Sequence, residues 1–179
     1  LPMRLGETST LFRNEESGEM HGLIRVRQFT ISEGHIILRP EQLEEEFKNC
    51  LELANYMLKT LGLDDDVSYR FSQWDPNNSS KYIGTPEQWE EAQSVMYKIL
   101  DHLGVKYTVG IDEAAFYGPK LDIQIRNVFG KEDTLITIQI DQMLAEQYGM
   151  EYIDVDGRKR RPYIIHRTSL GCYERTLAL

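Results

Sequence analysis

The change in hydrophobic periodicity along the chain constrains the fold more than any other feature. Two segments, residues 40–61 and 85–104, carry apolar side chains at helical spacing, and a glycine stands at the end of each. Proline stands at or near the start of both, and Thr85 and Gln88 have the spacing of a capping box. These signals predict two amphipathic helices.

Elsewhere apolar residues alternate with polar ones, which is the pattern of half-buried β-strands. The clearest strands are residues 67–71, 121–125 and 136–140. Residues 127–133 are short enough to join the last two strands in a hairpin, and a turn at 154–162 precedes a short strand at 163–165. Strands joined by hairpins, with helices gathered between them, predict an α+β domain: an antiparallel β-sheet with flanking helices.

Composition limits the possible functions. The length of 179 residues, 41% of them hydrophobic, suits one domain. A net charge of -9 argues against a general nucleic-acid binder, which relies on many Lys and Arg contacts to phosphate, so any RNA contact must be local or supplied by parts outside this chain. No apolar run approaches the roughly 18 to 20 residues that span a membrane, and the two cysteines, Cys50 and Cys172, suit a reducing compartment. We expect a soluble, cytoplasmic protein without membrane contact.

The first candidate site contains two arginines, Arg13 and Arg25, separated by a turn-prone stretch at 16–18. On neighbouring strands of one hairpin they can point at the same ligand. Arginine suits phosphate because its planar, permanently charged guanidinium donates two hydrogen bonds at once. The Glu15 carboxylate can accept from an exocyclic amino group, and Phe29 offers a flat face to a base. A nucleotide site is one interpretation, and solvated strand arginines with surface partners are the other.

Three further features can carry chemistry, and each has a structural alternative. A Gly-Pro pair holds Tyr117 and Lys120 at the entrance of a predicted strand, where a plain turn is the commoner case. His35 and His166 lie near strands, but two histidines are an incomplete ligand set for zinc. Arg175 lies one turn into a predicted helix that follows a glycine, and helix-surface arginines are common.

Taken in this order, the segments resemble the class II aminoacyl-tRNA synthetases, and within them the threonyl-tRNA synthetase family. Residues 12–29 look like motif 2, residues 171–179 look like the start of motif 3, and residues 115–120 match a segment of the threonyl branch. The resemblance covers residues 1–179. It implies a partial catalytic domain of this class, truncated at both ends, without the motif 1 that forms the dimer interface in the family.

The resemblance implies that ATP activates threonine to threonyl-adenylate, which then passes to tRNA(Thr), in a homodimeric parent protein that uses Mg²⁺. Arg13 would contact the α-phosphate, and Arg25 and Arg175 the outer phosphates. Glu15 would bind the adenine amino group while Phe29 stacks on the ring. By itself the fragment is expected to be inactive.

The family also binds threonine through a zinc ion, and His35 and His166 match two of its ligands. The third ligand is a cysteine upstream of motif 2, outside this chain, so we expect weak zinc binding or none. Positions near the amino acid and the tRNA acceptor end are matched by Glu33, Tyr117, Lys120 and Gln139, and Gln139 is also expected at ATP. Where the family commonly has Gln-Asp-Asp-Ala, this sequence has Ile-Ser-Glu-Gly at 31–34. Ile31 cannot make the hydrogen bonds of glutamine.

Two other functions fit the sequence. A non-catalytic, synthetase-like nucleotide-binding protein would keep the ATP site without activating an amino acid, and Ile31 favours this alternative. A class II ligase for another amino acid, such as serine or proline, is opposed by His35, His166 and the segment 115–120.

Overall fold

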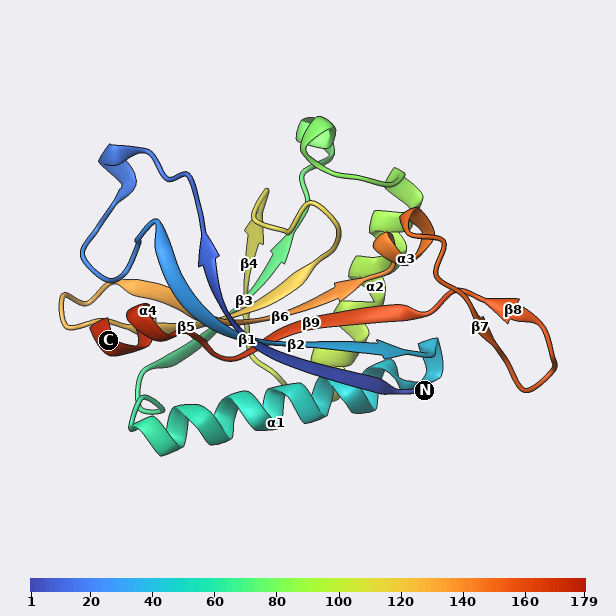
Figure 1. The fold of residues 1–179 in the computed structure, drawn as a ribbon, viewed down its shortest axis with the longest axis horizontal. Coiled ribbons are helices and arrows are strands. Elements are labelled where there is room, and N and C mark those ends of the chain that lie inside the picture. Colours follow the sequence, from blue (N-terminus) through green and yellow to red (C-terminus); the bar gives the residue numbers. More distant parts are fainter.

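A seven-stranded sheet forms the body of the computed structural model, which describes all 179 residues (Figure 1). In spatial order its strands are β1 (Met3–Phe12), β2 (Gln28–Leu38), β9 (Tyr163–Cys172), β6 (Glu132–Asp141), β5 (Lys120–Arg126), β3 (Val67–Gln73) and β4 (Thr108–Ile111). Strands β7 (Tyr152–Ile153) and β8 (Lys159–Arg160) form a separate hairpin that projects from one end. The predicted antiparallel sheet is confirmed except at one edge, where β3 and β4 run parallel.

Two long helices cover one face of the sheet. They are α1 (Leu43–Leu61), entered through the 3-10 turn η2 (Pro40–Gln42), and α2 (Pro86–His102). The shorter elements are η1 (Ser17–Glu19), η3 (Pro76–Lys81), α3 (Leu144–Gln147) and α4 (Tyr173–Ala178). Both predicted helices are confirmed: the Thr85–Gln88 capping box is formed, and Gly62 ends α1 with a left-handed φ of 70°. No helix is long and apolar enough to cross a membrane.

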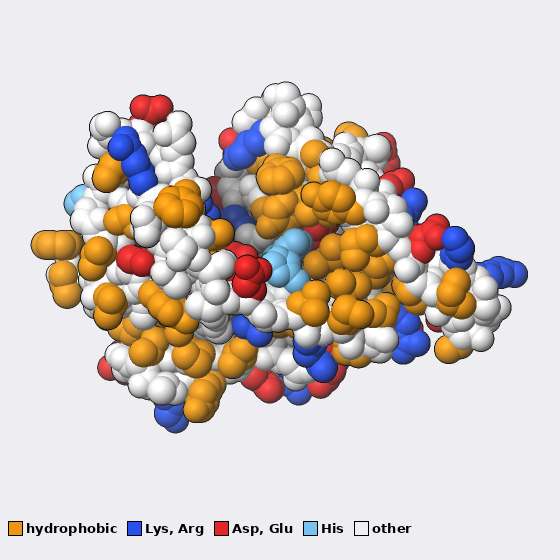
Figure 2. All heavy atoms as spheres, in the orientation of Figure 1, with side chains coloured by type: hydrophobic (Ala, Val, Ile, Leu, Met, Phe, Trp, Pro, Cys, Tyr) orange, Lys and Arg blue, Asp and Glu red, His pale blue; other side chains and the backbone are white.

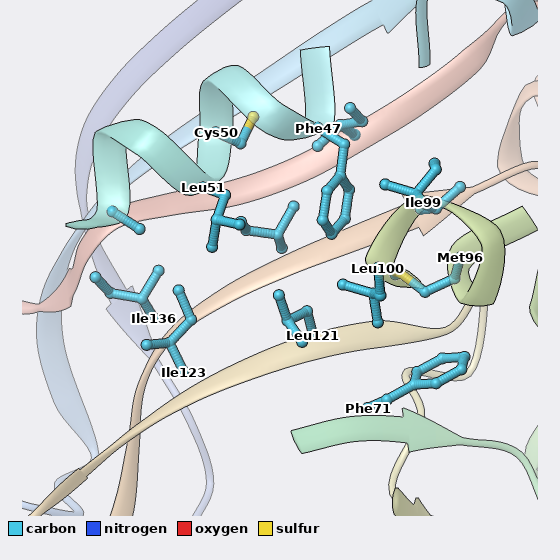
Figure 3. Packing of buried hydrophobic residues seen from close by; sticks show 14 of the residues in the cluster. Phe47, Cys50, Leu51, Phe71, Met96, Ile99, Leu100, Leu121, Ile123 and Ile136 are labelled. Atoms are coloured by element: carbon cyan, nitrogen blue, oxygen red, sulfur yellow. The ribbon is translucent and has the colours of Figure 1, made fainter. Parts of the chain in front are cut away.

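The main core lies between these helices and the sheet (Figure 3). Phe47 and Leu51 of α1 and Met96 and Leu100 of α2 point toward the same strand residues, among them Leu121. Phe47 and Leu121 are both 0% exposed. Burying one such side chain contributes about 1.5–3 kcal/mol, so this face is committed to packing and a binding site must lie on the other.

The prediction of half-buried strands holds for β6, where Thr137 and Gln139 are partly exposed, and is wrong for β5. In β5 the alternate polar residues Asp122 and Gln124 are only 2% and 4% exposed, and Thr168 of β9 is 9% exposed. These residues belong to the face opposite α1 and α2, where the β1–β2 connection and α4 stand over the strands. The alternation of apolar and polar residues therefore distinguishes the face that packs on the helices from a polar face that other segments cover. In β5, residues 121–125 are buried on both faces.

The predicted hairpin between β1 and β2 is present, with Phe12 opposite Gln28. Arg13 and Arg25 do not lie on its strands, however, because the pairing ends there and residues 13–27 form the connection. The Arg13 amide still donates to the Arg27 carbonyl at 2.8 Å, so the base of this connection is fixed. The strand predicted at 163–165 continues to residue 172, because β2 and β6 pair with it on both sides.

Candidate active site

The register of the sheet gathers polar side chains in two rows on the face opposite the long helices. Residues directly opposite on neighbouring strands point to the same face, and so do residues two apart on one strand. From β2 to β5, the first row is His35, His166, Gln139 and Lys120, and the second is Glu33, Thr168, Thr137 and Asp122. Residues far apart in sequence are thereby brought onto one surface.

The larger cavity on this face has a volume of about 400 Å³. The β1–β2 connection, strands β5 and β6, and the start of α4 enclose it. Every residue predicted at ATP lines it, namely Arg13, Glu15, Arg25, Phe29, Gln139 and Arg175. Lys120 and Asp122 lie in it as well. Figure 2 shows this hollowed face, with histidine and acidic side chains gathered beside the hollow.

Phe29 and Arg13 form a cation–π pair in this cavity. The Phe29 ring is 6% exposed, and the guanidinium carbon of Arg13 lies 5.0 Å from its centroid. An aromatic face and a planar guanidinium are both surfaces on which a flat heterocycle can stack. The pair joins an aromatic surface directly to a permanent positive charge.

Glu15 and Arg25, both predicted to contact ATP, bind each other in this structure. Arg25 donates from Nε and Nη2 to Glu15 Oε2 at 3.0 and 2.9 Å, and from Nη2 to Glu19 Oε2 at 3.0 Å. Hydrogen bonding from Arg25 lowers the pKa of Glu15, so its carboxylate stays ionised. Arg27, which sequence reasoning did not place in the site, donates to the Glu15 carbonyl at 3.0 Å and stabilises the connection.

Arg175 reaches the cavity from α4 and links two of its walls. Its Nε donates to the carbonyl of Ile24 at 3.0 Å and its Nη1 to the carbonyl of Thr134 at 2.7 Å. Beside it, both oxygens of Glu174 accept from the Thr30 amide, at 3.1 and 2.9 Å. Sequence reasoning missed Glu174, although its place next to the motif arginine was a usable signal. These bonds fix α4 against the β1–β2 connection, β2 and β6.

A smaller cavity of about 230 Å³ adjoins the larger one. Its lining includes Glu33, His35, Tyr117, Gln139 and His166, which are the residues predicted at threonine and zinc, apart from Lys120. The two cavities share Arg13, Ile31, Thr137, Gln139 and Thr168. Arg13 is the only charged side chain among these shared residues.

His35 and His166 lie side by side, with ring centroids 4.9 Å apart and planes at 86°. His166 Nε2 is 2.9 Å from Oδ2 of Asp141, which is 0% exposed. The other oxygen of Asp141 accepts from the amides of Met143 and Leu144 at 2.8 and 2.9 Å. A carboxylate that orients a histidine in this way is typical of zinc sites, and sequence reasoning missed it.

The donor set fits zinc in part. Burial and the neighbouring His166 lower the pKa of His35, so this imidazole is neutral near pH 7, which is the form that binds a metal. No group of three or more His, Cys, Asp or Glu side chains in the chain is placed to hold a metal ion. The histidines therefore fit zinc as two nitrogen ligands, and a complete set needs a further ligand from outside these residues.

Tyr117 stands over the histidines. Its hydroxyl donates to Gln139 Oε1, and its ring lies 4.9 Å from that of His166. Burial raises the pKa of Tyr117 above its ordinary value, so it remains a neutral donor. Gly118 lets this turn approach the sheet, because a Cβ there would lie 2.0 Å from the Ile140 carbonyl oxygen. This close approach is the physical reason why the Gly-Pro turn can hold Tyr117 against the sheet.

The fold and the two cavities define a class II aminoacyl-tRNA synthetase core. The chain belongs to the family described as the tRNA synthetase class II core domain (G, H, P, S and T), whose family model matches residues 1–179. Within that family its relatives are threonine–tRNA ligases. Those of Clostridium botulinum Eklund 17B and Gloeobacter violaceus are 69% and 46% identical over all 179 residues. The chain spans 28% of the length of these relatives.

Solved structures agree with this assignment. The RNA binding domain of threonyl-tRNA synthetase from Cryptosporidium parvum has a TM-score of 0.88 and 36% identity, covering 99% of this chain and 44% of that one. A seryl-tRNA synthetase from Pyrococcus horikoshii, with a TM-score of 0.68, 17% identity and coverage of 99% and 32%, shares the fold. The predicted class II fold and the resemblance to the threonyl branch are confirmed.

Proposed function

We propose that this chain carries the ATP and threonine sites of a threonine–tRNA ligase. One observation carries the proposal: a cationic cavity with an aromatic floor adjoins a second cavity that contains paired histidines, and Arg13 lines both. The identity to threonine–tRNA ligases over the whole chain supports the choice of amino acid. The activity belongs to the longer parent protein, and the 179 residues alone are proposed to be inactive.

The nucleotide occupies the larger cavity in this proposal. Adenine stacks on Phe29, and the ionised Glu15 accepts from its amino group. Because threonine must attack the α-phosphorus, that atom belongs where the two cavities meet, and Arg13 is the cation found there. Arg25 and Arg175 bind the outer phosphates. Arg25 exchanges Glu15 for phosphate when ATP enters, which frees Glu15 for the base.

Catalysis in this proposal rests on position and charge. A carboxylate oxygen of threonine attacks the α-phosphorus, the bond to the β-phosphate oxygen breaks, and pyrophosphate leaves. Arg13 and Lys120 stabilise the charge that moves during this step, and no protein nucleophile takes part. Mg²⁺, when bound with ATP, neutralises phosphate charge. The threonyl group then passes from the adenylate to the terminal ribose of tRNA(Thr).

Threonine occupies the smaller cavity. His35 and His166 are proposed as two ligands of a zinc ion, with the third supplied by a cysteine of the longer parent. Bound zinc would interact with the amino and hydroxyl groups of threonine, so valine, which lacks the hydroxyl, would be rejected. Glu33, Tyr117 and Gln139 complete the polar lining. We further propose a homodimeric, cytoplasmic parent.

Amino-acid-dependent ATP–pyrophosphate exchange by the full-length parent tests the proposal. Threonine should support exchange far better than serine, valine or proline. Fastest exchange with another amino acid would refute the threonine assignment. Ile31, an apolar residue 8% exposed at the junction of both cavities, favours a second candidate, a nucleotide-binding protein without activation. ATP binding with no exchange for any amino acid would support that candidate.

A further inference from the structure

A buried ion pair between Lys120 and Asp122 lines the larger cavity, and Asp122 has no role in the proposal so far. Lys120 Nζ pairs with Oδ2 of Asp122, two residues further along β5. The Asp122 side chain is 2% exposed and the Lys120 side chain 19%. The same Oδ2 accepts a hydrogen bond of 2.5 Å from Oγ of Ser72, a residue of β3 that is 0% exposed.

The three side chains share one face of the sheet because of its register. Ser72 lies opposite Lys120, and Lys120 lies opposite Gln139, which lines both cavities. Asp122 follows Lys120 by two residues and so points the same way. The ion pair therefore lies on the floor of the proposed active site.

Asp122 depends on Lys120 for its charge balance. Its Oδ1 is buried without a hydrogen-bond donor, so all stabilisation of the carboxylate reaches it through Oδ2. Arg70, opposite Asp122 on β3, pairs with Glu113 and Glu132 and offers no alternative cation. Because a buried carboxylate that loses its counter-ion is strongly disfavoured, Lys120 is held where it is.

We infer that Asp122 is a positioning residue, which fixes the Lys120 ammonium beside the point where threonine meets the α-phosphate. This inference rests on the proposed function and adds a residue to it. Ser72 orients the carboxylate, the carboxylate holds the ammonium, and the ammonium faces the substrates. A lysine on a flexible stem is thereby given the fixed geometry that charge stabilisation requires.

The test is a double-mutant cycle in the full-length parent, measured by threonine-dependent ATP–pyrophosphate exchange. Asp122→Asn is expected to lower kcat about 10- to 100-fold, because a small misplacement of a charged group has effects of this size. KM for ATP and for threonine should change by less than about 3-fold, since Asp122 binds neither substrate. Ser72→Ala, which removes the hydrogen bond but keeps the ion pair, should lower kcat less.

The decisive comparison adds Asp122→Asn to Lys120→Ala. If Asp122 acts through Lys120, the double variant has the kcat of Lys120→Ala alone. An equal loss of kcat from Asp122→Asn in both backgrounds would overturn the inference, and so would an unchanged kcat in a folded Asp122→Asn variant. If Asp122→Asn has a melting temperature too low for kinetic measurements, Asp122→Glu, which keeps the negative charge, takes its place in the same cycle. No threonine-dependent exchange by the wild type would instead overturn the proposed function.

Discussion

Gly171 lines the larger cavity, and the cost of replacing it by alanine follows from its backbone angle φ and from one distance. Gly171 has a left-handed φ of 77°, which costs an L residue about 1–2 kcal/mol. An added Cβ would also lie 2.0 Å from the carbonyl oxygen of Leu135, a backbone atom of β6. Relieving such an overlap in a packed region costs about 1–3 kcal/mol more. Gly171→Ala should therefore destabilise the fold by about 2–5 kcal/mol in total.

Gly62 supplies the matched control. Its φ is 70°, but nothing lies within 4 Å of an added Cβ, so Gly62→Ala bears only the conformational cost of about 1–2 kcal/mol. Urea unfolding followed by the fluorescence of Trp74 and Trp89 measures both variants. In the parent enzyme, Gly171→Ala should also raise KM for ATP, because β9 and α4 must shift together with Arg175. Equal destabilisation by the two substitutions would refute the reasoning.

Three further predictions concern charge and metal. Glu19→Gln should lower KM for ATP about 2-fold in pyrophosphate exchange, because Glu19 competes with phosphate for Arg25; a higher KM would contradict this. Burial raises the pKa of the Cys50 thiol to about 11 from 9.0, so its contribution to stability is complete below pH 9 and is lost as pH rises through 11. The melting temperature of Cys50→Ala should therefore fall less between pH 9 and pH 11 than that of the wild type. The same dependence of melting temperature on pH in both proteins would contradict this prediction. Asp141→Asn should weaken zinc binding by the parent about 10- to 100-fold, since Asp141 holds His166, and unchanged zinc affinity on titration would rule this out.

The two long helices and the pairing of β5 with β6 were predictable because local signals specify them. Thr85 and Gln88 fix one helix start, and the hairpin near Gly130 fixes the pairing of β5 with β6. The predicted residues also line two adjoining cavities, and for Glu33, Gln139 and the two histidines the resemblance to the family, not spacing, had marked the positions. Their contacts to ATP, threonine and zinc stay predictions.

Other features depended on tertiary context that spacing does not contain. Strand β4 was missed because four residues, Thr108–Ile111, are too few for a periodic signal, and its parallel pairing with β3 requires the α2 crossover. Asp122 and Asp141 looked like the solvent-facing half of alternating strands, yet both are buried, and each binds a residue far away in sequence, Ser72 and His166 respectively. The hydrogen bonds from Arg25 to Glu15 likewise appear only once the conformation of the β1–β2 connection is known.

The central claim is that one nucleotide cavity and one amino-acid cavity meet at Arg13. A crystal structure of the zinc-loaded parent with a non-hydrolysable sulfamoyl analogue of threonyl-adenylate tests it most directly. We predict adenine on Phe29, the sulfamoyl group against Arg13, and the threonyl side chain beside His35 and His166. An analogue bound with its adenine in the histidine cavity, or away from both cavities, would contradict the account.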